Sequence, residues 1–224
     1  MMIEHVIFDC DGVLVDSEPL SMRVDVALLA EHGIVMSEEE AHRRFVGKTF
    51  AAMIADMTSE FGVTFASGIS AEKDRRLLEL YAAELKPVAG VVETLRRLGM
   101  APYSVASNSP GERVAAALRL TGLNDYFTAG ITTFEDVTHG KPEPDVFIES
   151  ARRAGFSPAQ CLVIEDSVTG VTAASRAGCV VLGFTGTHGD PARLAPQLLA
   201  VGASAIFNRM ADLPELVSSR LGQA

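Results

Sequence analysis

The feature of this sequence that most constrains its fold is a regular alternation of short apolar runs with amphipathic helical segments after Pro87. Four β-prone runs cover residues 103–106, 127–131, 162–164 and 180–182, and helix-like segments cover residues 91–98, 111–120, 145–154 and 170–177. Short apolar runs separated by segments with helical spacing are typical of repeated β-α units. Such units predict an α/β fold whose parallel sheet carries helices on both faces.

A further β-prone run at residues 5–8 stands apart from the others, because the residues between about 17 and 86 have helical spacing throughout. The first run needs partners for its backbone, and the best partners are the runs after residue 100. We therefore expect one α/β domain, made of residues 1–16 and 87–224, that is interrupted by a helical domain at residues 17–86. A length of 224 residues agrees with one domain plus an insertion.

The charge and the cysteine content limit the possible binding partners and the cellular compartment of the protein. The 19 Lys and Arg against 29 Asp and Glu give a formal net charge of −10, which opposes binding to nucleic acid and to anionic membrane surfaces. No apolar run approaches the roughly 20 residues of a membrane span, and the N-terminal segment carries acids where a signal peptide needs cations. Three cysteines without a C-x-x-C pair favour reduced thiols. These features predict a cytoplasmic protein.

Polar side chains gather where the expected strands end, which is where ligands bind in open parallel sheets. These residues are Asp9, Asp11, Ser107, Asn108, Lys141, Glu165 and Asp166. Four converging carboxylates repel one another and oppose folding, and one lysine is too little compensation, so a cation is implied. Oxygen donors without His or Cys favour Mg²⁺, with Asp9, Asp11, Glu165 and Asp166 as its candidate ligands. For Glu165, a purely structural role is the alternative.

A carboxylate nucleophile, a second acid, a hydroxyl, a lysine and Mg²⁺ together predict phosphoryl transfer. Asp9 would attack phosphorus and form an aspartyl phosphate. Asp11, two residues later, points the same way on an extended chain, and would protonate the leaving alcohol and then deprotonate water. Ser107 would bind phosphoryl oxygens, Lys141 would offset negative charge, and Asp166 would hold the metal. Turn, cap and solvated-surface roles are the structural alternatives for these residues.

The order of these motifs resembles that of the haloacid dehalogenase superfamily. The first motif, D-x-D-G-V-L-V-D-S-E, covers residues 9–18, and Ser107, Gly140-Lys141-Pro142 and Glu165-Asp166-Ser167 match the other three in order. The chain is most similar to the β-phosphoglucomutase-like branch. The resemblance implies a Rossmann-like core with a mobile helical cap inserted after the first motif.

The same resemblance implies a Mg²⁺-dependent phosphatase that acts on a small soluble metabolite, such as a phosphorylated sugar or a sugar acid like 6-phosphogluconate. Sugar phosphomutases of this branch carry a histidine and an arginine where this sequence has Ser21 and Phe50. That arginine grips a second phosphate, so its absence favours hydrolysis over a mutase. A catalytically silent binding module is the remaining alternative, but every motif acid and the motif lysine are present.

Two further residues are expected to bind the substrate. Lys48 follows Gly47 in an expected turn between two helices of the inserted domain, where its ammonium group would meet the far end of the substrate. Asn108 follows Ser107 at a strand end and is expected to contact the substrate. An exposed surface position is the alternative for Lys48. The oligomeric state is open, with a monomer as the simplest expectation.

Overall fold

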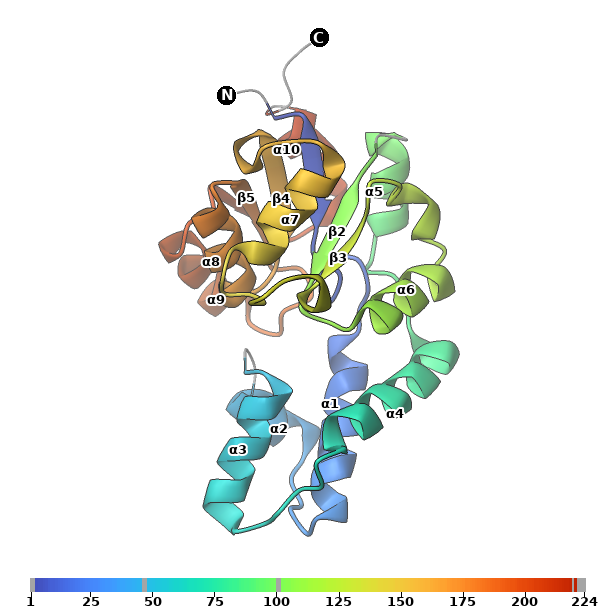
Figure 1. The fold of residues 1–224 in the computed structure, drawn as a ribbon, viewed down its shortest axis with the longest axis vertical. Coiled ribbons are helices and arrows are strands. Elements are labelled where there is room, and N and C mark those ends of the chain that lie inside the picture. The colour runs from blue at the N-terminus through green and yellow to red at the C-terminus, as the bar shows by residue number, and fades with distance from the viewer. Residues whose placement is uncertain (1–2, 46–47, 100–101, 219, 221–224) are drawn as a thin grey trace. The chain divides into compact units, whose positions relative to one another are not determined.

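The computed structural model describes residues 3–45, 48–99, 102–218 and 220. The chain divides into two compact units (Figure 1). One unit, here called the α/β unit, comprises Met1–Asp16 and Lys86–Ala224; the other, the helical unit, comprises Ser17–Leu85. Val46 and Gly47, and with them the expected turn before Lys48, lie outside the described residues.

A six-stranded parallel sheet forms the centre of the α/β unit, as the alternating pattern predicts. Its order is β3-β2-β1-β4-β5-β6, so the first strand is central and is flanked by strands that follow the helical insertion. The strands are β1 (His5–Phe8), β2 (Ser104–Ser107), β3 (Gly130–Thr133), β4 (Cys161–Glu165), β5 (Val180–Phe184) and β6 (Ala205–Phe207). The Rossmann-like parallel sheet with an inserted helical segment is therefore confirmed.

Two parts of the expected sheet differ from the structure. The run at residues 127–131 predicted a strand, but the strand begins only at Gly130, and Phe127 instead packs its ring edge against Phe8 at 5.8 Å between centroids. Phe127 is apolar because it fills the core, not because it pairs in the sheet. The edge strand β6 is not among the expected strands, because a run of only three residues is too short to show a strand periodicity.

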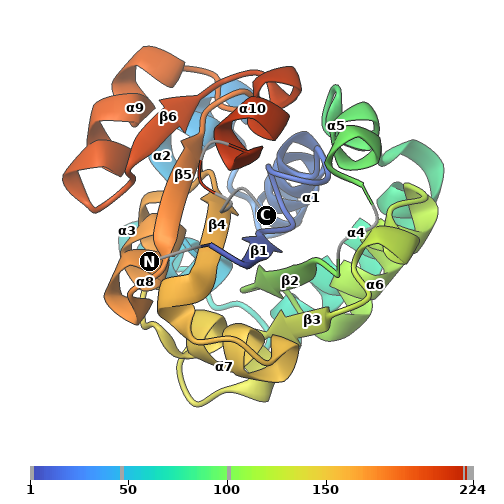
Figure 2. The same cartoon turned by 90° about the horizontal axis from the view of Figure 1, so that it is seen from above.

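Helices cover both faces of the sheet (Figure 2). On one face, α7, α8 and α9 pack with Ile7, Val163 and Val181 of the central strands in one apolar cluster. Helices α5, α6 and α10 lie on the opposite face (Figure 2). The α-helices among the described residues of this unit are α5 (Val91–Leu98), α6 (Gly111–Leu120), α7 (Asp145–Ala154), α8 (Val168–Ala177), α9 (Pro191–Ala200) and α10 (Leu213–Ser218).

The helical unit is built around its own small core. Its helices are α1 (Glu18–Glu31), α2 (Glu38–Phe45), α3 (Phe50–Phe61) and α4 (Ile69–Glu84). Leu29, Met53 and Met57 belong to one buried apolar cluster. Helix α2 begins after Ser37, whose hydroxyl accepts a hydrogen bond from the backbone N–H of Glu40 at 3.1 Å.

The described helices include none with the length and apolar character that a bilayer crossing requires. The three cysteines are free; Cys10 and Cys161 are buried and Cys179 is half-buried.

Candidate active site

Asp9 lies directly after the central strand, at the carboxyl end of the sheet. The parallel register pairs Phe8 with Ile164, and the Asp9 backbone N–H donates to the Ile164 carbonyl at 2.9 Å. This pairing places Asp9 beside Glu165, the last residue of β4. Asp9 is only 7% exposed and Glu165 only 1% exposed, so two carboxylates are buried next to each other.

Lys141 joins these two carboxylates. Its Nζ donates to Asp9 Oδ1 at 2.5 Å, to Glu165 Oε1 at 2.7 Å and to the Ala106 carbonyl at 3.0 Å. A lysine ammonium has three N–H donors, so these contacts use all of them. The side chain is buried and also lies over the Phe147 ring, with Nζ 5.0 Å from its centroid. Its position is therefore fixed by both electrostatics and packing.

The pKa values of Asp9 and Lys141 are shifted by burial and by the charges around them. Burial raises the pKa of Asp9 to about 7, with Glu165 and Asp11 adding to the rise and Lys141 opposing it. Burial by itself lowers the pKa of Lys141, but the carboxylates of Asp9 and Glu165 outweigh this and raise that pKa above its ordinary value. Lys141 is thus held charged beside the two buried carboxylates.

Asp166 completes a group of three acids with metal-binding geometry. One carboxylate oxygen each from Asp9, Glu165 and Asp166 lie within 4.8 Å of one another. Asp166 packs over Gly12, whose φ of +76° favours glycine, and a Cβ on Gly12 would stand 1.9 Å from Asp166 Oδ2. An all-oxygen set with uncompensated charge fits a hard divalent cation such as Mg²⁺.

Glu165 differs from Asp166 in how its oxygens are bound. Its Oε1 accepts from Lys141, and its Oε2 accepts from the Ser167 backbone N–H at 2.8 Å and from the Ser167 hydroxyl at 3.0 Å. The carboxylate also lies against Gly170, where a Cβ would stand 1.6 Å from Oε1. Protein groups therefore fix both Glu165 oxygens, an arrangement that suits a residue that positions Lys141.

The carboxylate of Asp11 lies outside the group of three acids and has a separate hydrogen-bond chain. Its Oδ2 accepts from the Ser109 hydroxyl at 2.5 Å, and the Arg113 guanidinium donates to that hydroxyl in turn. The sequence analysis did not single out Ser109 or Arg113. Their spacing holds a weak signal, since Ser109 is two residues beyond Ser107 and Arg113 is four residues further, in the first turn of α6.

Ser107 and Asn108 both lie at the site. The Ser107 hydroxyl is buried and accepts a hydrogen bond from the Ser109 backbone N–H at 3.0 Å. The Asn108 side-chain amide holds the backbone of Lys141 at both ends: Oδ1 accepts from its N–H at 2.8 Å and Nδ2 donates to its carbonyl at 3.0 Å. Asn108 therefore positions Lys141, while its expected contact with substrate remains a prediction.

Cys10 lies between the two aspartates, but its chemistry does not suit catalysis. Burial, followed by the charges of Asp11 and Asp9, raises the pKa of its thiol well above the ordinary value. The thiolate is the nucleophilic form of cysteine, so this side chain stays inert. Cys10 is therefore not a candidate nucleophile.

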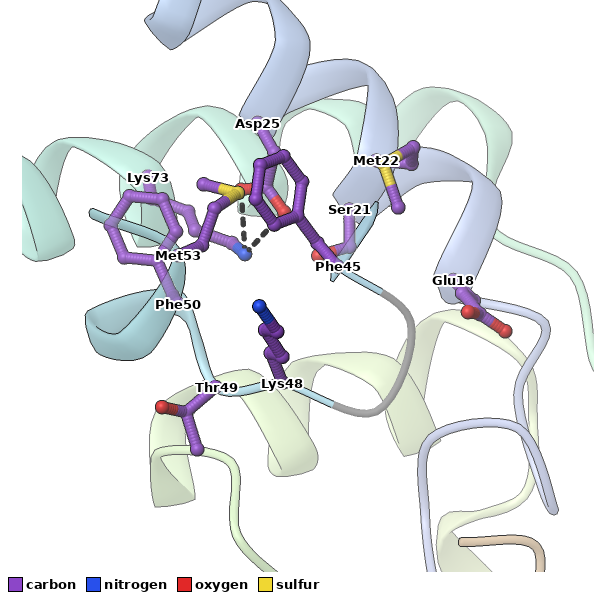
Figure 3. Close-up of a pocket in the computed structure, with 10 residues that line it drawn as sticks. All are labelled: Glu18, Ser21, Met22, Asp25, Phe45, Lys48, Thr49, Phe50, Met53 and Lys73. Atoms are coloured by element: carbon purple, nitrogen blue, oxygen red, sulfur yellow. Dashed lines mark hydrogen bonds and ion pairs between the residues drawn. The ribbon is translucent and has the colours of Figure 1, made fainter. Parts of the chain in front are cut away.

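Lys48 belongs to a cavity within the helical unit (Figure 3). Its Nζ forms an exposed ion pair with Asp56 Oδ2 at 2.6 Å. The cavity has a volume of about 140 Å³ and is also lined by Ser21 and Phe50.

Comparison with known proteins identifies the family of this chain. The chain is 29% identical to the 6-phosphogluconate phosphatase of Escherichia coli over 97% of this chain and 96% of that protein. A haloacid dehalogenase-like protein from Agrobacterium tumefaciens has a similar solved structure, with a TM-score of 0.84 and 35% identity over 97% of this chain and 98% of that one.

A hydrolase of the same family from Deinococcus radiodurans, solved with bound phosphate and sodium, matches with a TM-score of 0.78 and 29% identity over 99% of both chains. Residues 3–178 match the family model described as haloacid dehalogenase-like hydrolase. This match covers most of the α/β unit and the whole helical insertion. The chain therefore belongs to the haloacid dehalogenase-like hydrolases.

Proposed function

We propose that this hydrolase is a Mg²⁺-dependent phosphatase of small phosphorylated metabolites, and that its substrates are phosphates of sugars or sugar acids. The observation that carries the proposal is the buried Lys141 ammonium between Asp9 and Glu165, with Asp166 beside them. Support also comes from the similarity to a 6-phosphogluconate phosphatase and to a family member with bound phosphate.

In the proposed reaction, a carboxylate oxygen of Asp9 attacks phosphorus, and the bond from phosphorus to the alcohol oxygen breaks. Asp11 gives its proton to that leaving oxygen. Asp11 then takes a proton from water, the water oxygen attacks the phosphorus of the aspartyl phosphate, and inorganic phosphate leaves as Asp9 is restored. Lys141 and the Ser107 hydroxyl stabilise the charge on the phosphoryl oxygens.

Asp9 and Asp166 are the residues that would hold Mg²⁺, with the Asp11 carboxylate reserved for proton transfer. The bound ion would stabilise negative charge on the transferring phosphoryl group. Glu165 would act through Lys141, because both of its oxygens already accept hydrogen bonds from protein groups.

The metal assignment predicts a difference between two adjacent acids. Asp166→Ala should raise the Mg²⁺ concentration required for half-maximal activity more than Glu165→Ala does, because Asp166 is the direct ligand. Glu165→Ala should instead lower kcat at saturating Mg²⁺, because Lys141 loses one of the two carboxylates that position it. Magnesium titrations of initial rates would measure both effects, and equal shifts in the Mg²⁺ requirement would contradict the assignment.

If Asp11 is the proton donor, the loss of rate in an Asp11 variant should depend on the leaving group of the substrate. Asp11→Asn should slow hydrolysis of an alkyl phosphate by about 10²–10⁴-fold, the usual range for a general acid. The loss should be smaller for p-nitrophenyl phosphate in the phosphorylation step, because a nitrophenolate leaves without a proton. Burst kinetics separate this step from hydrolysis of the intermediate. Similar losses for both substrates in that step would point to another acid.

Lys48 is proposed to bind the carboxylate of a sugar acid. Its exposed pair with Asp56 is the kind that contributes little, so the ammonium can exchange partners. Lys48→Ala should lower kcat/KM for 6-phosphogluconate about 10–100-fold relative to glucitol 6-phosphate, which has no carboxylate, as expected for a charge-assisted hydrogen bond. An unchanged ratio would make Lys48 a solvated surface residue.

A phosphomutase is the alternative within the same family branch. Phe50 occupies the position of the mutase arginine, and its ring lies 4.4 Å from the Nζ of Lys73. Each of the two lysines of the cavity, Lys48 and Lys73, is paired with a carboxylate. These features favour hydrolysis over capture of a second phosphate.

The proposed function is tested by measuring phosphate released from a panel of sugar, sugar-acid and simple alkyl phosphates, with Mg²⁺ and with a chelator. We expect Mg²⁺-dependent release that is fastest for the sugar and sugar-acid phosphates. Transfer of phosphate between two positions of one sugar, without release, would establish the mutase alternative.

A further inference from the structure

A hydrogen-bonded chain of polar side chains holds the Asp11 carboxylate. Asp11 Oδ2 accepts from the Ser109 hydroxyl at 2.5 Å, and that hydroxyl accepts in turn from the Arg113 guanidinium. Ser109 is only 5% exposed, and Arg113 is half-buried in the first turn of α6. The Ser109 backbone N–H donates to the Ser107 hydroxyl at 3.0 Å. Both the backbone and the side chain of Ser109 are therefore fixed.

The hydrogen bonds of this chain have one direction. A guanidinium donates hydrogen bonds and cannot accept them, so the Ser109 hydroxyl must accept from Arg113. A serine hydroxyl carries a single hydrogen, and here that hydrogen is directed to Asp11 Oδ2. It is then not available to a phosphoryl oxygen of a substrate. Ser109 is therefore suited to holding Asp11 and not to binding phosphate.

The backbone next to Asp11 is held by other contacts. The Gly12 carbonyl accepts from the Thr187 hydroxyl at 2.8 Å, and the Gly12 backbone N–H donates to the Val15 carbonyl at 2.9 Å. The main chain is thus fixed in a tight turn, and the rotation of the Asp11 side chain remains to be set. The hydrogen bond from Ser109 restricts that rotation.

The two oxygens of Asp11 consequently differ in what they can do. Oδ2 accepts a hydrogen from Ser109, so a proton on Oδ2 would face that hydrogen. The proton for the leaving alcohol is therefore carried by Oδ1. Without Arg113, the Ser109 hydroxyl could turn and accept from a protonated Oδ2. The acidic proton would then be directed to Ser109 instead of to the substrate.

We propose that Ser109 and Arg113 are positioning residues that reserve one oxygen of Asp11 for proton transfer to the leaving alcohol. The inference rests on the proposed phosphatase function, in which Asp11 is the general acid. Neither residue contacts the reacting atoms, and both act through Asp11. Removing either one should therefore slow only those reactions that need the acid.

The test compares glucitol 6-phosphate, whose alcohol needs a proton to leave, with p-nitrophenyl phosphate, whose nitrophenolate does not. The ratio kcat/KM covers the reaction up to loss of the leaving group, so it reports the step that uses the acid. Ser109→Ala should lower kcat/KM for glucitol 6-phosphate about 10–100-fold, the effect of one lost hydrogen bond to a charged group. The value for p-nitrophenyl phosphate should be nearly unchanged.

Variants of Arg113 give the same test at the other end of the chain. Arg113→Met should lower kcat/KM for glucitol 6-phosphate relative to p-nitrophenyl phosphate, as Ser109→Ala does. Arg113→Lys should restore most of the lost activity, because an ammonium also donates and cannot accept. Arg119→Met is the matched control, since Arg119 is an exposed residue of the same helix. It should leave both kcat/KM values unchanged.

Two further measurements separate positioning from phosphate binding. Adding Ser109→Ala to Asp11→Asn should cause no further loss for glucitol 6-phosphate, because Ser109 acts only through the Asp11 carboxylate. The inhibition constant of inorganic phosphate should be the same for Ser109→Ala and for wild type, because the Ser109 hydrogen is directed to Asp11. Circular dichroism would verify that each variant is folded.

Three outcomes would overturn the inference alone. These are equal losses for both substrates in the folded variants, an unchanged ratio of the two kcat/KM values, and a further loss on top of Asp11→Asn. A weaker inhibition by phosphate in Ser109→Ala would make Ser109 a phosphate-binding residue instead. By contrast, failure of the wild-type protein to release phosphate from any probe in the presence of Mg²⁺ would overturn the proposed function, and this inference with it.

Discussion

Asp9→Asn should reduce turnover by at least about 10³-fold, equivalent to roughly 4 kcal/mol of activation free energy, while the protein remains folded. Asparagine keeps the shape of the side chain, but its amide is far too weak a nucleophile to attack phosphorus. The loss should be the same for every phosphate ester, since all would pass through the same aspartyl phosphate. A variant that retains turnover within about tenfold of wild type would contradict the assignment.

The stability of this variant provides a second measurement. Because the Asp9 pKa is raised, the ionised carboxylate is less favourable in the folded protein than in the unfolded chain. Removing its charge leaves Lys141 paired with Glu165 alone. In a chelator at pH 8, Asp9→Asn should therefore have a Tm equal to or above that of wild type. Asp125→Asn, at an exposed position of the same unit, is the control for the substitution itself.

Lys141→Met should reduce kcat by about 10²–10³-fold even at saturating Mg²⁺, which is the usual effect of removing one preorganised charge-stabilising donor. It should also destabilise the protein by about 3–5 kcal/mol, because two buried carboxylates lose their shared partner. Initial rates and urea denaturation would measure the two effects.

A double variant separates the two roles of Lys141. Adding Glu165→Gln to Lys141→Met removes one of the uncompensated carboxylates, so part of the lost stability should return. The lost turnover should not return, because the phosphoryl oxygens would still lack the ammonium group. If turnover recovered along with stability, Lys141 would be a structural residue, and the proposed catalytic role would be wrong.

The spacing of apolar residues was sufficient to predict most of the scaffold. The strand at residues 5–8 and the helices at residues 111–120 and 145–154 have the expected bounds, because amphipathic periodicity and turn signals are local properties. The helices α9 and α10 and the strand β6 were missed, and the start of β3 was displaced. The strand β6 and the start of β3 lack a clear local pattern. Their positions depend on neighbouring strands and on core residues such as Phe127.

The candidate site was predicted in outline, because the carboxyl ends of parallel strands meet at one edge of the sheet. That rule brought Asp9, Lys141 and Glu165 together as expected, although they are far apart in the chain. It did not indicate which oxygen binds which partner. The contact between Ser109 and Asp11 spans 98 residues, and the contacts between Asn108 and Lys141 span 33.

By itself, the sequence determined the α/β class, the helical insertion and the set of acids and the lysine that gather at the strand ends. These follow from local periodicity and from residue types at strand termini. Only the tertiary structure decided that Glu165 is bound through both oxygens, that Ser109 holds Asp11, and that Asp25 and Lys73 pair inside a cavity. Hydrogen bonds and ion pairs require the three-dimensional approach of particular atoms, and no local spacing specifies that approach.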